Sequence, residues 1–294
     1  MSRPKKIHEP LEADFNTVLS SIADGGKPKI ELLSSAKPFV KWVGGKRSIV
    51  PQLLERMPAE YKTYREPFVG GGALFFAAKP EQAYISDVNM HLILAYQAVR
   101  EDMEKLTSLL DGHLRRHNEK YFGRARERLS EESNPTKIAA LFIYLNKTCF
   151  NGLYRVNKKG KFNVPIGRYD NPSLYDESVL KADRAALQDV EIWQHPFDQM
   201  PYEKGDFVYF DPPYHKTYSG YDSSGFQDAE HKKLADFCSQ LHKAGVHFML
   251  SNSNTEYVRA LYKNFNIDEV AAKRSVSCKA ESRGKETEII VKNY

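Results

Sequence analysis

Cysteine is scarce in this sequence of 294 residues, and long apolar runs are missing. The three cysteines, Cys149, Cys238 and Cys278, lie far apart and form no Cys-x-x-Cys pair, so neither a disulfide framework nor a zinc site is expected. No apolar stretch approaches the roughly 20 residues of a membrane-spanning helix, and none follows the basic N-terminal residues as in a secretory signal. The sequence therefore predicts a cytoplasmic protein with no metal centre and no membrane contact.

Two common phosphate-binding signatures, GxxxxGKS/T and GxGxxG, are also missing, and their absence disfavours a P-loop ATPase. Glycines are instead grouped at 70–72, between an expected strand at 64–69 and an expected helix at 73–78. Glycines at such a turn let the backbone approach a ligand closely, although many are only tight turns. Asp87 ends the next expected strand, where an acid can accept both ribose hydroxyls of an adenosine-containing cofactor or cap the following helix.

Positive charge is concentrated in the middle of the chain. Residues 111–170 carry 13 Lys and Arg against 6 Asp and Glu, whereas the whole chain has a net charge of +5. Such a stretch suits a segment that binds a polyanion, although a solvated surface of mixed charge would look the same. With 41% hydrophobic and 28% charged residues, the chain as a whole has the composition of an ordinary soluble globular protein.

Short apolar segments alternate with helical patterns on both sides of this basic stretch. The alternation predicts an α/β fold with an open, mostly parallel sheet whose ligands bind at the carboxyl ends of the strands. We expect an N-terminal extension at 1–36, a first domain at 37–110 and 189–294, and an inserted, mainly helical domain at 111–188. The expected elements are strands at 64–69, 84–87, 190–193, 207–210, 246–250 and 288–291, and helices at 13–22, 48–57, 73–78, 90–110 and 229–244.

The strongest functional signal is Asp211-Pro212-Pro213-Tyr214, directly after the apolar segment 207–210. Two prolines cannot continue a strand ladder, so they predict a rigid loop at the end of the strand. The Asp211 carboxylate and the Pro212 carbonyl could bind the two N–H bonds of an exocyclic amino group on an aromatic base, which would favour the pyramidal, more nucleophilic nitrogen. Tyr214 could stack on such a base, or serve only as a buried tyrosine in a structural turn.

Two further segments combine aromatic and basic residues with glycine. Residues 41–46 (KWVGGK) predict either a core tryptophan beside a turn or a cofactor lid, with Trp42 and Lys46 near the methionine end. Residues 150–165 predict a hairpin, which is either a solvated surface loop or a loop that enters a DNA groove. In a groove, Arg155 would bind guanine O6 and N7, and an aromatic or leucine side chain would support an unstacked step. The lysines suited to phosphates are Lys158, Lys159 and Lys161.

Taken together, these motifs resemble those of the Dam family of DNA adenine methyltransferases. The resemblance covers nearly all of the chain from Pro38 to Tyr294 and rests on six segments in the family order. They are KWVGGK, EPFVGGGALFF, SDVN, NGLYRVNKKGKFNVPIGRY, DPPY and RGKETEIIVKNY. This order, with the glycine motif first, the recognition insert next and DPPY last, is similar to that of the alpha group of amino methyltransferases.

The resemblance implies an enzyme that transfers the methyl group of S-adenosylmethionine to adenine N6 in double-stranded DNA by base flipping, with GATC as the expected target. It implies a seven-stranded Rossmann-like sheet and a target-recognition domain that carries the hairpin. The residues expected at the target amino group are Asp211, Pro212 and Tyr214. Those expected at the cofactor are Trp42, Lys46, Phe68, Gly70, Gly72, Asp87, Phe197 and Asp211. Those expected at DNA are Lys41, Phe150, Asn151, Leu153, Arg155, Lys158, Lys159 and Lys161.

The sequence departs from the family pattern at one position and leaves two other functions open. Family members often carry an acid just before the aromatic residue that matches Phe197, but this chain has Pro196, so Phe197 is expected only to stack on the cofactor adenine. The alternatives are an RNA or cytosine-N4 amino methyltransferase and a DNA-binding protein with a silent catalytic centre. The motif order argues against the first, and the intact catalytic and cofactor motifs argue against the second. We also expect a monomer in solution.

Overall fold

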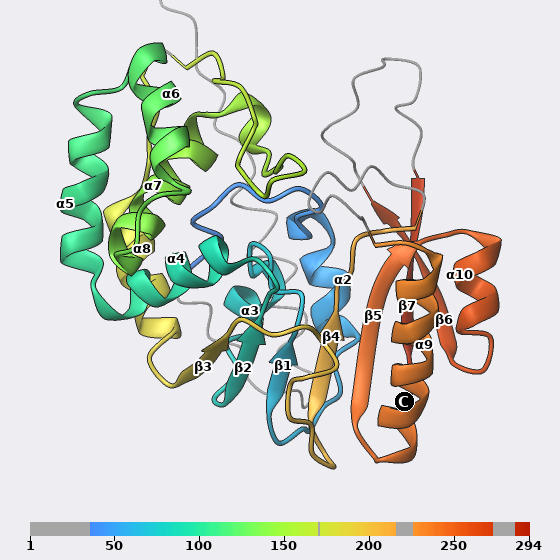
Figure 1. Cartoon of the computed structure of the whole chain (residues 1–294). Coiled ribbons are helices and arrows are strands. Elements are labelled where there is room, and N and C mark those ends of the chain that lie inside the picture. Colours follow the sequence, from blue (N-terminus) through green and yellow to red (C-terminus); the bar gives the residue numbers. More distant parts are fainter. Residues whose placement is uncertain (1–35, 170, 216–225, 273–285) are drawn as a thin grey trace, which may run out of the picture. The chain divides into compact units, whose positions relative to one another are not determined.

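The described part of the computed structural model contains a seven-stranded sheet with helices on both faces (Figure 1). The described residues are 36–169, 171–215, 226–272 and 286–294. The chain divides into two units, residues 1–31 and 32–294. The expected N-terminal extension and its helix at 13–22 lie outside the described residues, apart from position 36.

The strands follow the order β3-β2-β1-β4-β5-β7-β6. Neighbours from β3 to β5 are parallel, and β7 runs antiparallel between β5 and β6. The predicted open, mostly parallel sheet is therefore confirmed, with the antiparallel pairs at one end. The strands are β1 (Tyr64–Glu66), β2 (Ala83–Ser86), β3 (Val190–Trp193), β4 (Phe207–Phe210), β5 (His247–Ser253), β6 (Asn266–Ala272) and β7 (Glu286–Lys292).

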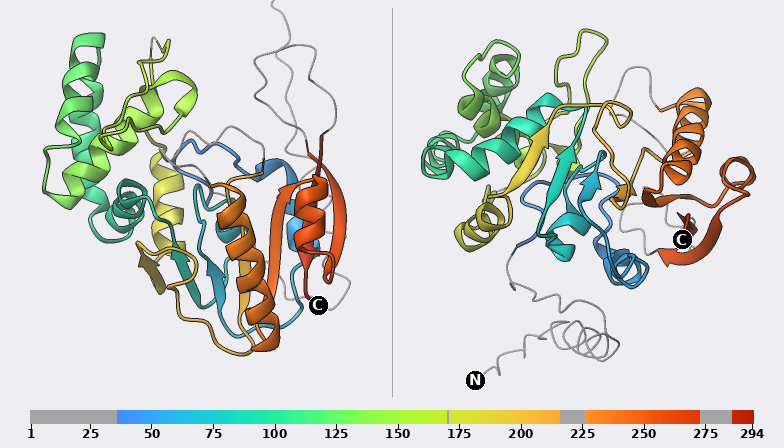
Figure 2. Two further views of the ribbon diagram at one scale, coloured as in Figure 1. Left: turned by 45° about the vertical axis from the view of Figure 1, so that its right-hand side comes forward. Right: turned by 90° about the horizontal axis from the view of Figure 1, so that it is seen from below.

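Helices cover both faces of the sheet because the chain crosses it in two directions. From β1 through α3 (Ala73–Ala78) to β2 the chain moves toward β3, whereas from β4 through α9 (Asp228–Lys243) to β5 it moves toward β7. Right-handed crossovers in opposite directions place their helices on opposite faces, as Figure 2 shows for α3 and α9. Between these layers β4 is buried at all four positions, which explains its uninterrupted apolar sequence.

The middle of the chain forms a group of helices beside the β3 edge of the sheet (Figure 1). Helix α7 is apolar on most sides and largely buried, as expected for a helix at the centre of such a group. It packs against α4, α5 and α6. Within the described ranges, no helix is both long and apolar enough to cross a membrane. The group comprises α4 (Met90–Glu101), α5 (Met103–Leu114), α6 (Glu119–Arg128), α7 (Pro135–Thr148) and α8 (Glu177–Ala186). Two further helices, α2 (Val50–Glu55) and α10 (Glu256–Leu261), do not belong to it.

The helical stretch expected at 90–110 is present, but it is divided into two helices, α4 and α5, that meet at Asp102. The Asp102 backbone has φ −139° and ψ 39°, outside the helical range. Its carboxylate accepts a hydrogen bond of 2.8 Å from the Thr136 hydroxyl on α7. The apolar pattern continues across Asp102, from Val99 to Met103 and Leu106, so periodicity did not reveal the break.

The predicted hairpin at 150–165 is present in a less regular form. Two isolated antiparallel bridges, Val156 to Phe162 and Cys149 to Ile166, pair its arms. Its tip is closed by a hydrogen bond of 2.8 Å from the Gly160 N–H to the Asn157 carbonyl. The first arm opens with a single 3-10 turn, Phe150–Gly152, and has no regular strand.

Candidate active site

The Asp211 carboxylate lies at the carboxyl end of β4, where two donors bind the same oxygen. The Lys46 ammonium is 2.8 Å from Oδ1, and the Ser251 hydroxyl donates to Oδ1 at 2.9 Å. Because a serine hydroxyl has one proton, the buried Tyr209 hydroxyl donates in turn to Ser251 Oγ, at 2.9 Å. Burial raises the pKa of Asp211, and the Lys46 ammonium and the Ser251 hydroxyl oppose this rise. The carboxylate is thus oriented through one oxygen by a chain of hydrogen bonds that starts inside the sheet.

The rest of the loop 211–215 is held by β5 and β7. Asn252 and Ser253 of β5 bind the backbone of His215, with 3.1 Å from the His215 N–H to Asn252 Oδ1 and 2.8 Å from Ser253 Oγ to the His215 carbonyl. On β7, Glu288 Oε2 accepts a hydrogen bond of 2.8 Å from the Tyr214 hydroxyl. Every one of these anchors was missed by sequence reasoning, although the polar run Ser251–Ser253 directly follows the predicted strand 246–250 and could have been found there.

The Lys46 ammonium sits between the two groups that the sequence assigned to the target base. It is 2.8 Å from Asp211 Oδ1 and 4.5 Å from the centre of the Tyr214 ring, and the Lys46 side chain is only 7% exposed. The Gly44 carbonyl also accepts a hydrogen bond from it. A base that stacks on this face of the Tyr214 ring would take the place of the ammonium.

Two glycines shape the turn between β1 and α3. Gly70 has φ +47° and Gly72 has φ +68°, values that side-chain-bearing residues rarely adopt. A Cβ on Gly70 would lie 2.6 Å from the Trp42 ring, and one on Gly72 would lie 2.7 Å from the Tyr96 hydroxyl. Both positions therefore require glycine, and Trp42 packs directly on the turn.

Asp87 follows β2 and binds the glycine turn. Its carboxylate accepts hydrogen bonds from the Gly70 N–H at 3.2 Å and from the Asn89 N–H at 2.9 Å. The cap of α4 is Asn89, whose side chain accepts from the Leu92 N–H, so the alternative role of Asp87 as a helix cap is wrong. Burial raises the pKa of Asp87 to about 6, and the backbone donors oppose this.

Phe68 and Phe197, both expected at the cofactor, contact each other. Their rings are stacked with centres 5.7 Å apart and planes 27° apart. No base fits between two rings in direct contact, so an adenine has to stack on another face of Phe197 or part the pair. The fit of these residues to an adenosine-containing cofactor is otherwise good, since an acid, a glycine turn and two stacking rings meet at the carboxyl ends of β1 and β2.

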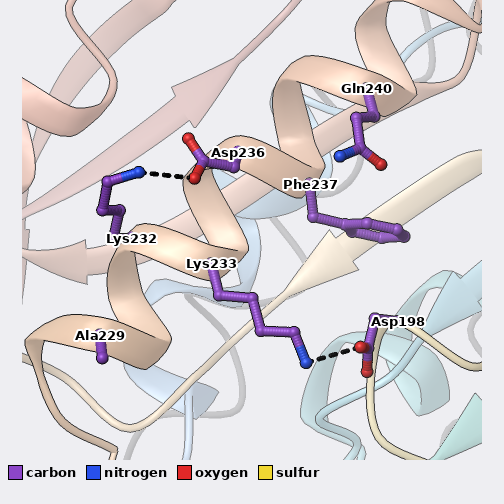
Figure 3. A pocket seen from close by; sticks show the side chains of 7 residues that line it. All are labelled: Asp198, Ala229, Lys232, Lys233, Asp236, Phe237 and Gln240. Carbon is purple, nitrogen blue, oxygen red and sulfur yellow. Dashed lines mark hydrogen bonds and ion pairs between the residues drawn. The ribbon is translucent and has the colours of Figure 1, made fainter.

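A cavity of about 610 Å³ is lined by residues of α9 and by Asp198 (Figure 3). Its two lysines are paired with carboxylates, Lys233 with Asp198 at 2.6 Å and Lys232 with Asp236 at 2.8 Å. Paired charges at an open surface offer a ligand little net attraction. The candidate catalytic and cofactor residues lie instead at the carboxyl ends of the strands. In the part of the chain that the structure describes, no group of three or more His, Cys, Asp or Glu side chains could hold a metal ion.

Lys41, expected at DNA, packs against the end of α7 and the segment that follows it. Its N–H donates to Asn146 Oδ1 at 2.8 Å, and its ammonium is 2.9 Å from the Tyr169 hydroxyl. A Cβ on Gly152 would lie 2.4 Å from the Lys41 side chain, so only glycine fits there. Lys41 therefore joins the motif at 41–46 to the hairpin, a link that sequence reasoning missed together with Asn146 and Tyr169.

The hairpin presents the other residues expected at DNA. The Arg155 guanidinium is bound within the hairpin, donating from Nε to Asn163 Oδ1 at 2.7 Å and from a terminal nitrogen to the Asn163 carbonyl at 3.2 Å. Phe150 is 49% exposed, and Asn151 is exposed with φ 54°. Leu153 is half-buried. The exposed lysines are Lys158, Lys159 and Lys161.

A stack of aromatic rings connects the hairpin to the glycine turn. Trp42, which packs on Gly70, stacks on Tyr154 of the hairpin with ring centres 6.0 Å apart. The Tyr154 hydroxyl is 2.9 Å from Nδ1 of His91, on α4. Trp42 therefore contacts both the expected cofactor turn and the expected DNA-binding hairpin.

Comparisons with known proteins agree with this geometry. Residues 42–276 match the model of the family described as D12 class N6 adenine-specific DNA methyltransferase. The chain is 40% identical over 281 residues to the type II methyltransferase M1.LlaDCHI of Lactococcus lactis subsp. cremoris, covering 91% of this chain and 98% of that protein. It is 42% identical over 286 residues to the type II methyltransferase M.MjaIII of Methanocaldococcus jannaschii, covering 88% and 99%. The DNA adenine methylase of Serratia marcescens is 30% identical over 264 residues, covering 86% and 97%.

Proposed function

The chain belongs to the family of D12 class N6 adenine-specific DNA methyltransferases, and from that premise we propose that it methylates adenine within GATC in duplex DNA. It is therefore an enzyme with DNA as substrate and S-adenosylmethionine as methyl donor. The observation that carries the chemistry of this proposal is the arrangement of Asp211, Lys46 and Tyr214, in which an acceptor and an aromatic face flank one small cation. The expected target rests on the hairpin sequence at 150–165. That space suits the amino group of a base.

Asp211 and Pro212 act on the target amino group. The lone pair of an exocyclic amine is conjugated into the ring, so the planar nitrogen is a poor nucleophile. Hydrogen bonds from its two N–H groups to the Asp211 carboxylate and the Pro212 carbonyl favour the pyramidal nitrogen and so stabilise the transition state. S-adenosylmethionine supplies the methyl group from its sulfonium centre. Within the described residues, Lys46 and Ser251 both donate to Oδ1 of Asp211. The other oxygen, Oδ2, is therefore the one that accepts from the amino group of the base.

Adenine N6 inside a duplex is not accessible to a loop of this kind, so the base is rotated out of the stack. Tyr214 then stacks on the extruded base, and Lys46 gives up its place over the Tyr214 ring. The lost ion pair and cation–π contact are replaced by the contacts of the base. The amino group of the base keeps Asp211 hydrogen-bonded, but being neutral it does not replace the positive charge of Lys46.

The cofactor residues follow from the turn and its neighbours. The Asp87 carboxylate accepts the ribose hydroxyls, and Gly70 and Gly72 let the backbone approach. Phe68 and Phe197 stack on the adenine, and the chain has Pro196 where relatives often carry an acid for the adenine amino group. Trp42 covers the methionine end, with Lys46 beside it.

The inserted domain at 111–188 reads the DNA. Arg155 leaves Asn163 to bind guanine O6 and N7, the bidentate contact that best distinguishes guanine in the major groove. Phe150, Asn151 and Leu153 support the unstacked step, and Lys41 approaches the DNA from the first domain. The residues that contact phosphates are Lys158, Lys159 and Lys161.

Transfer from labelled S-adenosylmethionine to matched duplexes with and without GATC tests this proposal. We expect N6-methyladenine only in the GATC duplex, and Asp211→Ala should abolish transfer while cofactor binding persists. Label in both duplexes would refute the target, and near-normal turnover of Asp211→Ala would refute its role. Labelled RNA, or N4-methylcytosine as the product, would support a different amino methyltransferase. Salt-sensitive DNA binding without any transfer would support a silent DNA-binding protein.

The relatives named type II methyltransferases motivate a role in restriction and modification. We expect a cytoplasmic monomer that protects DNA from a nuclease with the same target. Cells that express the chain should yield DNA resistant to a GATC endonuclease blocked by adenine methylation. Complete digestion of that DNA would contradict the role, and a dimer in sedimentation would contradict the monomer.

A further inference from the structure

Tyr214 can receive a base only if the face of its ring is held in one orientation. Its backbone follows two prolines, which restrict the loop. The prolines leave the side-chain torsions of Tyr214 free, and the ring is only partly buried. Stacking depends on the angle between ring planes, so a ring that rotates loses part of its contact with a base.

The far end of the Tyr214 ring is fixed by Glu288. The Tyr214 hydroxyl donates to Glu288 Oε2 at 2.8 Å, across 74 positions of sequence. Glu288 is only 7% exposed, which limits the access of water that could replace it. Its strand β7 is paired on both sides, with Glu288 in register with Ser253 of β5 and Val270 of β6, so its backbone is rigid.

We propose that Glu288 is a positioning residue for methyl transfer, which holds the Tyr214 ring parallel to the incoming base. It touches neither substrate nor cofactor and acts through the Tyr214 hydroxyl. This inference rests on the proposed role of Tyr214 as the stacking platform. The carboxylate also keeps the ring in place beneath the Lys46 ammonium, 4.5 Å from the ring centre, before the base arrives.

The test is a double-mutant cycle with Glu288→Ala and Tyr214→Phe, measured as single-turnover transfer to a duplex that the enzyme methylates. Glu288→Ala should slow transfer by about tenfold, the lower range for loss of a hydrogen bond to a charged group. The dissociation constants of S-adenosylmethionine and of DNA should stay within about twofold, because Glu288 acts through the Tyr214 hydroxyl and contacts neither ligand in this arrangement. Tyr214→Phe should cause a similar loss, and Glu288→Ala should add nothing to it.

Glu288→Gln separates positioning from a merely structural effect. Its amide oxygen can still accept from the Tyr214 hydroxyl, so the transfer rate should recover to near that of the unmodified enzyme. Glu269→Ala is the matched control, because this glutamate on the adjacent strand β6 forms an exposed ion pair with Arg259. Thermal unfolding of every variant identifies any that has lost its fold. If Glu288→Ala is unfolded, the transfer rates of Glu288→Gln and Tyr214→Phe are compared instead.

The outcomes distinguish this inference from the proposed function. A normal rate in Glu288→Ala, or a tenfold loss that persists in the Tyr214→Phe background, would overturn the positioning role. If Tyr214→Ala abolishes transfer while Glu288→Ala does not, only the positioning role fails. If Tyr214→Ala leaves transfer unchanged, the stacking role of Tyr214 fails, and the inference fails with it.

Discussion

Replacing Ser251 by alanine should move the acid limb of the methyl-transfer pH profile to higher pH. Ser251 donates to Asp211 Oδ1 at 2.9 Å, and this bond stabilises the ionised carboxylate. Once a base displaces Lys46, Ser251 is the donor that remains on this oxygen among the described residues. Its removal therefore adds to the rise in pKa that burial already causes at Asp211.

The size of the shift follows from the strength of one hydrogen bond. A bond to a charged group contributes about 1.5–3 kcal/mol, and one pKa unit corresponds to about 1.4 kcal/mol, so the acid limb should move up by about 1 to 2 pH units. The assay is single-turnover transfer with saturating cofactor and DNA, measured across the pH range where the fold is stable. Ser251→Ala also removes the acceptor of the buried Tyr209 hydroxyl, so a lower melting temperature is expected as well.

Ser253→Ala is the control for this prediction, because its hydroxyl binds the His215 carbonyl and not the Asp211 carboxylate. It can slow transfer by loosening the loop, but it should leave the midpoint of the acid limb unchanged. An unmoved midpoint in Ser251→Ala, with a lower rate, would refute the reasoning. Asp211 would then not need to be ionised for transfer, or Ser251 would act only on the fold.

Three further predictions concern other parts of the site. Binding of S-adenosylmethionine should weaken as the pH falls through about 6, where the buried Asp87 takes up a proton, and calorimetry should find this dependence lost in Asp87→Asn. Burial raises the pKa of Glu66 to about 8 from its ordinary 4.5, so its contribution to stability is present at low pH and is lost as the pH rises toward 8. Glu66→Gln should therefore melt like the unmodified protein near pH 4.5 and at a higher temperature above pH 8; equal melting at both would contradict the assignment. Replacing the three hairpin lysines by alanine should reduce the salt dependence of DNA binding by an amount equal to about three phosphate contacts, and the choice of target sequence should not change. Altered discrimination among target sequences would show that these lysines read bases. These lysines are Lys158, Lys159 and Lys161.

Much of the sheet could be predicted because its strands carry their own signal. β4 is an unbroken apolar segment, and the run 246–250 marks most of β5. β6 was not predicted, because an edge strand with the sequence NIDEVAA has a weak apolar pattern. The break between α4 and α5 was missed because the apolar pattern continues across Asp102.

The sequence by itself determined the features that depend on the backbone of a few adjacent residues. Two prolines after a strand make the loop at 211–214 rigid, and Gly70 and Gly72 occupy conformations that other residues rarely adopt. The same short segment, 211–214, also identified the two residues that would act on the base, Asp211 and Tyr214.

Only the tertiary structure decided which residues hold that loop in place. Ser251 lies 40 positions from Asp211, and Glu288 lies 74 positions from Tyr214. Their approach depends on the register of β4, β5 and β7, which is set by the packing of whole strands against the layers around them. A shift of one residue in that register would point each anchor to the opposite face of the sheet, so the polar run at 251–253 is visible in the sequence but its partners in the loop are not.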